Sequence, residues 1–195
     1  YGYTEGVEAT TGPLGQGLAM GVGMALAEAH LHEVFMKEDE SLFDHYTFVL
    51  ASDGDMMEGV TNEASSLAGA LGLNKLIVLY DSNEITIEGD TSIAFRESVR
   101  GRYEALGWET QLVEDGNDLS ALQEAIDRAK QAERPTLIEV RTQIGFGSPR
   151  VGTAKAHGEP LGDDNVTLTR TELQWEHGPF TLPEGTVSYR EDYLA

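Results

Sequence analysis

The chain has 195 residues, 40% of them hydrophobic, which is enough to bury the core of one globular domain. Its 34 acidic against 13 basic residues give a net charge of −21, which disfavours nucleic acid and anionic membranes as partners, and no apolar run approaches the roughly 18–20 residues of a membrane span. The absence of cysteine excludes disulfides and thiolate metal sites, and it makes the cytoplasm the default location.

The first part of the chain predicts a long helix and then a β-α-β unit. Residues 14–36 have apolar positions at helical spacing, and three glycines interrupt them: Gly17, Gly21 and Gly23. Because glycine in a helix costs about 1 kcal/mol relative to alanine, these glycines indicate a closely approaching backbone or ligand, or close packing alone. There follow a buried strand, a helix and a second apolar strand, at 46–51, 62–71 and 75–80.

The second part continues the alternation of helices and strands. A helix is predicted near 95–106, then a strand, a helix and a strand near 108–113, 119–132 and 136–142. The spacing of Ser120 and Gln123 is that of a capping box, which favours a helix start there. This order predicts an α/β fold: a doubly wound, mostly parallel sheet with helices on both faces. We expect one domain over 1–162 and an extended arm or linker, 163–195, toward another domain.

Polar side chains follow both strands of the β-α-β unit. Asp53 and Gly54 come after the first strand, and Asp81 and Asn83 end the next. Ligands of parallel sheets bind at the carboxyl ends of strands, so the two loops can share one ion. Asp-Gly alone is also typical of an ordinary turn. The carboxylate, the amide oxygen and a nearby backbone carbonyl are hard ligands, suited to Mg²⁺ or Ca²⁺ that also coordinates a diphosphate.

Two motifs in this region resemble a known signature. Ser52-Asp-Gly followed by Asp81-Ser-Asn83 resembles the diphosphate-binding signature of thiamine-diphosphate enzymes, although Ser52 stands where those enzymes commonly have glycine. Longer segments, in order and spacing, resemble transketolase across residues 2 to 162: 8–17, 55–60, 63–69, 75–80, 103–108, 144–149 and His157-Gly158. Deoxyxylulose-phosphate synthases and dehydrogenase E1 components share the signature but lack this series of segments.

The resemblance implies a thiamine-diphosphate-binding fold that holds thiamine diphosphate with Mg²⁺ or Ca²⁺. By this resemblance the cation would be ligated by Asp53, Asn83 and the backbone carbonyl of Ile85. Gly54 would donate an N–H group to the diphosphate. His157 would contact the diphosphate and share in proton transfer near the substrate, which makes it a catalytic candidate.

Other matching positions would contact the rings of the cofactor or the partner subunit. Gly12 and Leu14 would lie near the aminopyrimidine ring. The thiazolium side would be formed by Asp81, which lies near the ring, and by two apolar residues that pack on it, Ile87 and Ile144. Glu58, the second catalytic candidate, would belong to a carboxylate network at the subunit interface.

These residues also have interpretations that need no ligand. The side chains of Leu14, Ile87 and Ile144 are compatible with simple core packing. Glu58 is compatible with a solvated charge at a helix start, and His157 with an ordinary loop histidine. The other histidines match no functional position and are interpreted as structural: His30, His32, His45 and His177.

The activity implied by the resemblance is transfer of a two-carbon ketol unit from a ketose phosphate to an aldose phosphate, in the pentose phosphate pathway. The family acts as a homodimer, and a pyrimidine-binding domain of the second subunit completes the site, so we expect this chain alone to be inactive. It would be a fragment that starts inside a full transketolase. The alternatives are a split-gene subunit, a non-catalytic cofactor-binding module, or dihydroxyacetone synthase.

Overall fold

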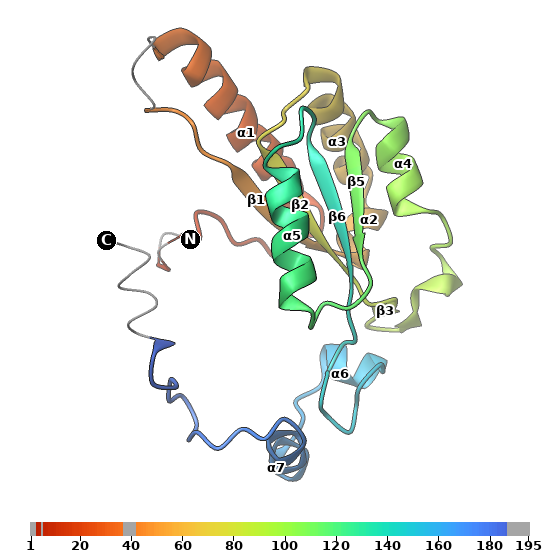
Figure 1. Ribbon diagram of the computed structural model, residues 1–195. Coiled ribbons are helices and arrows are strands. Elements are labelled where there is room, and N and C mark those ends of the chain that lie inside the picture. The colour runs from red at the N-terminus through yellow and green to blue at the C-terminus, as the bar shows by residue number, and fades with distance from the viewer. Residues whose placement is uncertain (1–2, 5, 37–41, 187–195) are drawn as a thin grey trace.

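The computed structural model describes residues 3–4, 6–36 and 42–186, and its centre is a parallel sheet (Figure 1). The sheet has four strands in the order β1-β2-β6-β5: Thr47–Ser52, Leu76–Ser82, Thr136–Arg141 and Glu109–Val113. All neighbouring pairs are parallel, and each observed strand begins and ends within two residues of its predicted range. The predicted α/β fold with a parallel sheet is therefore confirmed.

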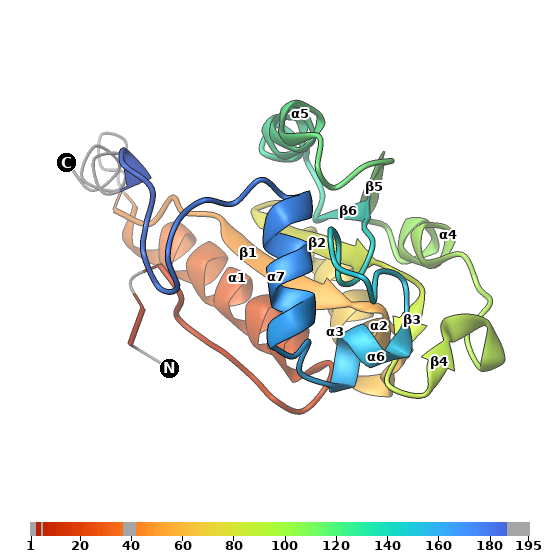
Figure 2. The ribbon, with the colours of Figure 1, turned by 90° about the horizontal axis from the view of Figure 1, so that it is seen from below.

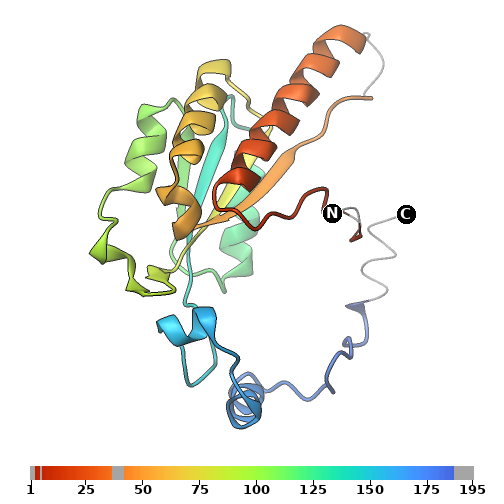
Figure 3. The same cartoon turned by 180° about the vertical axis from the view of Figure 1, so that it is seen from behind.

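Helices cover both faces of this sheet. Three of them lie on one face, which is turned to the viewer in Figure 3: α1 (Gln16–Phe35), α3 (Gly59–Leu71) and α4 (Val99–Ala105). Helix α5 (Leu119–Ala129) lies on the opposite face and packs on β2, β5 and β6. Each face has its own apolar core, because the strand side chains alternate between the two.

Gly21 and Gly23 in α1 have different surroundings. A Cβ atom on Gly21 would lie 2.3 Å from Val49 Cγ2, so this glycine lets the helix approach β1 closely. At Gly23 a Cβ atom would have no described atom within 4 Å. Close packing against a strand thus explains Gly21, whereas nothing in the structure explains Gly23.

Helix α5 begins where it was predicted but with a different cap, and helix α4 begins later than predicted. The side chain of Asp118 accepts a hydrogen bond from Ala121 N at 3.0 Å, so Asp118 caps α5 and the capping box expected from Ser120 is wrong. Helix α4 begins at Val99, several residues later than expected, because Ser98 caps it by accepting from Gly101 N at 3.1 Å. In both cases a short polar side chain just before the apolar stretch satisfies a free backbone N–H group.

Several short elements were not predicted. Helix α2 (Asp53–Met57) follows β1 directly, and two short strands pair after β2: β3 (Ile85–Thr86) and β4 (Gly89–Asp90). A 3₁₀ turn, Thr91–Ile93, follows, and two further helices come after β6: α6 (Ala154–Gly158) and α7 (Asp163–Glu172). The two helices lie at the carboxyl end of the strands (Figures 1 and 2).

The prediction of an extended arm over 163–195 is wrong at its start, where helix α7 lies. Residues 163–172 are helical rather than extended, with none of their side chains buried. The segment after the helix touches the loop that follows β6, since a Cβ atom on Gly147 would lie 2.6 Å from Leu173 Cδ2. The last part of the predicted arm, 187–195, lies outside the described residues. Of the described helices, none combines the length and apolarity of a membrane span.

Candidate functional site

Asp53 lies at the junction of β1 and α2, and it joins the carboxyl ends of the first two strands. Its Oδ1 accepts a hydrogen bond from the Tyr80 hydroxyl at 2.5 Å. Its Oδ2 accepts from the backbone N–H groups of Asn83 and Glu84, at 3.1 and 2.9 Å. Asp53 is only 3% exposed. The three donors, which lie in β2 or directly after it, hold its carboxylate in one orientation. The structure therefore brings together Asp53 and Asn83, as their positions after neighbouring strands predicted.

Burial is the main cause of the shift in the pKa of Asp53. Desolvation raises the pKa of Asp53, and the nearby charge of Asp81 adds to the increase, while the bonds from Tyr80, Glu84 and Asn83 oppose it. Burial and the hydrogen bond to Asp53 likewise raise the pKa of Tyr80, so Tyr80 stays neutral and donates. A desolvated carboxylate gains more from a bound cation than an exposed one does.

The turn after β2 has the backbone shape that aims both N–H groups at Asp53. Glu84 has φ of 62°, in the left-handed region, which is uncommon for a residue other than glycine. The Asn83 side-chain oxygen accepts from Ile85 N at 3.0 Å, which ties the amide to its own loop. The Asp53 carboxylate, the Asn83 amide oxygen and the Ile85 carbonyl are all hard oxygen donors, and each oxygen has more than one lone pair. This donor set fits Mg²⁺ or Ca²⁺.

Leu14 and Gly54 lie against each other across the loop before α1. A Cβ atom on Gly54 would be 3.1 Å from Leu14 Cδ1, so the leucine side chain packs closely on the start of α2. Leu14 remains half exposed, which places it at the rim of the site rather than in the core. Gly12 precedes it in the same loop, and a Cβ atom there would have no described atom within 4 Å.

Asp81 connects the ends of β2 and β6. The Thr142 hydroxyl and the Asn83 side-chain amide both donate to its Oδ1, the latter at 3.2 Å. Ile144 follows two residues after Thr142 and is half-buried, with its carbonyl accepting from Gly152 N at 2.8 Å. The loops after β2 and β6 thus meet at the same edge of the sheet.

The remaining predicted residues lie on neighbouring elements: Ile87, His157 and Glu58. Ile87 is 63% exposed, between β3 and β4. His157 is exposed on α6, a short helix that packs against β3, so it does not lie in a loop as expected. Glu58 is half-buried at the junction of α2 and α3.

Two residues at the site were missed by the sequence analysis. Tyr80 is buried in the middle of an apolar strand, and only the fold shows that its hydroxyl reaches Asp53. Asp55 binds both Ser52 and Gly15, and the Ser52-x-x-Asp55 spacing is a capping-box signal that the sequence does contain.

Comparison with known proteins gives consistent results. The family described as "Transketolase, thiamine diphosphate binding domain" matches residues 1–194. A transketolase from Streptococcus pyogenes is 55% identical over 182 residues, covering 93% of this chain and 25% of the relative, and one from Bacillus subtilis is 54% identical over 179 residues, covering 91% and 27%.

Solved structures show the same likeness. A transketolase from Leishmania mexicana superimposes with a TM-score of 0.89 at 44% identity, covering 93% of this chain and 28% of that one. A Pichia stipitis transketolase in complex with sedoheptulose 7-phosphate gives 0.90 at 46% identity, covering 95% and 28%. The chain therefore spans about a quarter of the length of these relatives. The matches over almost all of its residues show that the chain belongs to the transketolase family, as its thiamine diphosphate binding domain.

Proposed function

We propose that this chain supplies the diphosphate- and cation-binding half of the cofactor site in a transketolase. The complete enzyme would transfer a two-carbon ketol unit from a ketose phosphate to an aldose phosphate, as a cytoplasmic step of the pentose phosphate pathway. The observation that carries the proposal is the Asp53 carboxylate, buried where β1 and β2 end and oriented by three hydrogen bonds. Family membership supports thiamine diphosphate as the cofactor.

The cation would be Mg²⁺ or Ca²⁺, and its ligands would be Asp53, Asn83 and the Ile85 carbonyl. With a net charge of −21, this chain repels a diphosphate, so a cation is needed to neutralise the phosphate groups locally. Gly54 would present its N–H group to the same diphosphate. Tyr80 keeps one Asp53 oxygen oriented, and as a neutral donor it adds no charge of its own.

The other site residues would position the rings of the cofactor and the substrate. Gly12 and Leu14 would line the aminopyrimidine ring, and the thiazolium side would be formed by Asp81, Ile87 and Ile144. Thiamine diphosphate, when bound, supplies a nucleophilic carbon and stabilises the charge left by C–C cleavage. Thr142 and Asn83 donate hydrogen bonds that hold the Asp81 carboxylate at the carboxyl end of β2.

Two residues would act nearer to the substrate and the partner. His157, which is exposed on α6, would contact the diphosphate and share a proton with the substrate. Glu58 would join a carboxylate network at a subunit interface. We propose a homodimer in which the pyrimidine-binding domain of the second subunit completes the site, with sugar phosphates as substrates. A Pichia stipitis relative has been solved with such a sugar phosphate.

Substitution of the central carboxylate tests the proposal. Asp53→Ala removes the only charged ligand, so we expect it to abolish Mg²⁺-dependent binding of thiamine diphosphate in the complete protein. Isothermal titration calorimetry with and without Mg²⁺ measures this. Asp118→Ala is the matched control, because it removes a carboxylate that accepts from Ala121 N to cap the start of α5 and is not among the proposed site residues.

The control variant should bind the cofactor as the wild type does. Unchanged thiamine diphosphate affinity in Asp53→Ala would contradict the ion assignment. A wild-type protein that binds no thiamine diphosphate in the presence of Mg²⁺ would contradict the function itself.

A further inference from the structure

The Asp55 carboxylate connects two segments that are far apart in the sequence. Its Oδ1 accepts a hydrogen bond from Gly15 N at 2.8 Å, across 40 residues of chain. Its Oδ2 accepts from Ser52 N at 2.9 Å and from the Ser52 hydroxyl at 3.2 Å. One side chain thus joins the loop before α1 to the turn that begins α2.

The loop has little room to move at this joint. Gly15 is buried and has φ of 78°, and a Cβ atom there would lie 2.7 Å from Thr61 Oγ1 and 2.9 Å from Glu58 Cβ. The Thr61 hydroxyl, itself fully buried, donates to the Asp55 carbonyl at 2.6 Å. Packing and hydrogen bonds therefore fix Gly15 against α2 and α3 from two sides.

This joint lies between the two ends of the proposed cofactor site. On the ring side, Leu14 directly precedes Gly15, and Gly12 lies three residues before it. Asp53 and Gly54, on the diphosphate side, directly precede Asp55, and the Leu14 side chain rests on Gly54. A shift of Gly15 relative to Asp55 would change the distance between the two ends.

We propose that Asp55 is a positioning residue that sets the spacing between the ring-binding loop and the diphosphate-binding turn. It acts through Gly15 and Ser52, without contact to the cofactor. This inference rests on the proposed function. A carboxylate suits the role because it only accepts, whereas three donors converge on its two oxygens.

Asp55→Asn tests this with almost no change of shape. The amide oxygen can replace one carboxylate oxygen, but the NH₂ group then faces an N–H donor, so one of the two connections is lost. The measurement consists of two separate calorimetric titrations of the complete, gene-encoded protein in the presence of Mg²⁺. One uses thiamine diphosphate as the ligand, and the other uses inorganic diphosphate. Inorganic diphosphate reports the cation end alone, and thiamine diphosphate reports both ends together.

We expect Asp55→Asn to weaken thiamine diphosphate binding about ten- to a hundredfold, the worth of a hydrogen bond to a charged group. Binding of inorganic diphosphate should stay as in the wild type. Asp118→Asn is the matched control, since it makes the same chemical change at a helix cap outside the site, and it should alter neither affinity.

An equal loss of both affinities in Asp55→Asn would overturn the positioning role, and so would unchanged affinity for thiamine diphosphate. If that variant does not fold, Thr61→Val decides, because it removes only the bond that supports the Asp55 carbonyl. A loss confined to thiamine diphosphate then supports the proposal, and an equal loss overturns it. A wild-type protein that binds inorganic diphosphate but not thiamine diphosphate would instead refute the proposed function.

Discussion

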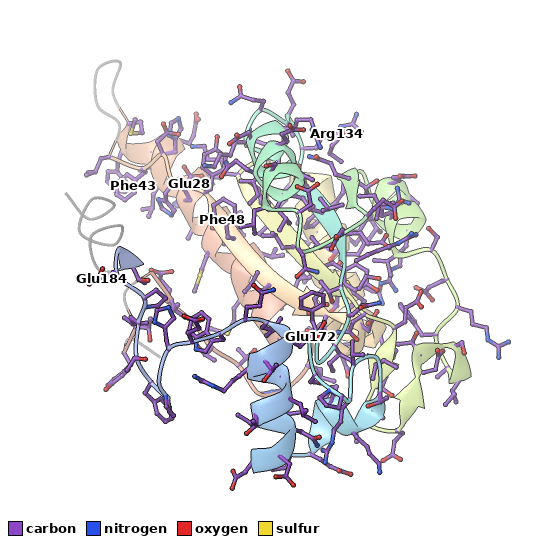
Figure 4. All side chains as sticks on the ribbon, turned by 60° about the horizontal axis from the view of Figure 1, so that its bottom comes forward. Glu28, Phe43, Phe48, Arg134, Glu172 and Glu184 are labelled. Atoms are coloured by element: carbon purple, nitrogen blue, oxygen red, sulfur yellow. The ribbon has the colours of Figure 1, made fainter. Side chains whose placement is uncertain are left out.

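Lys75, just before β2, holds two carboxylates at the end of the sheet opposite the cofactor site. Its Nζ lies 2.7 Å from Glu28 Oε1 and 2.6 Å from Asp44 Oδ1. Glu28, labelled in Figure 4, is only 3% exposed on α1. Burial opposes the charge on Lys75, but the hydrogen bonds to Asp44 and Glu28 raise its pKa. Because an unpaired buried carboxylate is costly, Lys75 keeps Glu28 compatible with the core.

The exposed member of this group predicts a pH dependence. The hydrogen bond and the charge of Lys75 lower the pKa of Asp44 from its ordinary value of 3.8. A carboxylate with a lowered folded pKa contributes stability above its unfolded pKa, and the contribution is lost as pH falls through the folded value. Asp44→Asn should therefore lower the Tm at neutral pH and leave it nearly unchanged in strong acid.

Thermal melts of both proteins over a pH series from neutral down past 3.8 measure this. The curves of Tm against pH for the wild type and Asp44→Asn should converge below pH 3.8. A constant difference in Tm at every pH would show that the Asp44–Lys75 pair does not provide the acid-dependent part of the stability.

At the scale of elements, α1 contains two glycines with opposite surroundings. Gly21→Ala places a methyl group 2.3 Å from Val49 Cγ2, and such overpacking costs about 1–3 kcal/mol, more than the gain in helix propensity. Gly23→Ala meets no described atom within 4 Å, so it should stabilise the protein by about 1 kcal/mol. Urea unfolding of both variants measures the two changes. Equal stabilisation by both would show that β1 does not limit the approach of α1.

The main elements were predictable because each strand of the sheet is a short apolar run between polar loops. Helices α2 and α6 were not, since each has only five residues and too few apolar positions for periodicity to show. Helix α7 has no buried side chain, so no apolar stripe marks it. The cap of α5 was misplaced because Asp118 and Ser120 are both good caps, and only the backbone path selects Asp118.

The candidate site was predictable to the extent that it depends on strand ends. Asp53 and Asn83 follow neighbouring parallel strands, so topology alone brings them together. The bond from Tyr80 to Asp53 and the bond from Gly15 to Asp55 depend on three-dimensional packing between segments distant in sequence, which periodicity does not encode. The interpretation of Leu14 as a core residue is not supported, because its side chain is half exposed beside Gly54.

At the scale of the whole molecule, one face of β1 has no covering helix among the described residues. Phe48, labelled in Figure 4, is 46% exposed and Leu50 is 84% exposed, on the face where α5 covers the other strands. Parallel strands are ordinarily buried on both faces. Because this apolar surface is exposed, we expect a polypeptide of these residues alone to self-associate.

Neighbouring substitutions on β1 test that expectation. Leu50→Thr should change the free energy of unfolding by less than about 0.5 kcal/mol, because the side chain is exposed, and should lower both self-association and binding of a hydrophobic dye. Val49→Thr, one residue away on the buried face, should cost about 1–3 kcal/mol through its buried hydroxyl. Sedimentation velocity and dye fluorescence measure association. Unchanged association in Leu50→Thr would mean that another surface is responsible.

The order of the strands also has a consequence for biosynthesis. β6 is the last strand of the sheet to be translated, yet it lies between β2 and β5 and pairs with both. Until residues 136–141 leave the ribosome, β5 has no partner strand to join it to the β1–β2 pair. The sheet therefore closes in one late step, and that step also brings Thr142 to Asp81. A nascent chain that stalls before β6 would leave open the edges of β2 and β5 that β6 covers, and open strand edges are targets for chaperones and for aggregation.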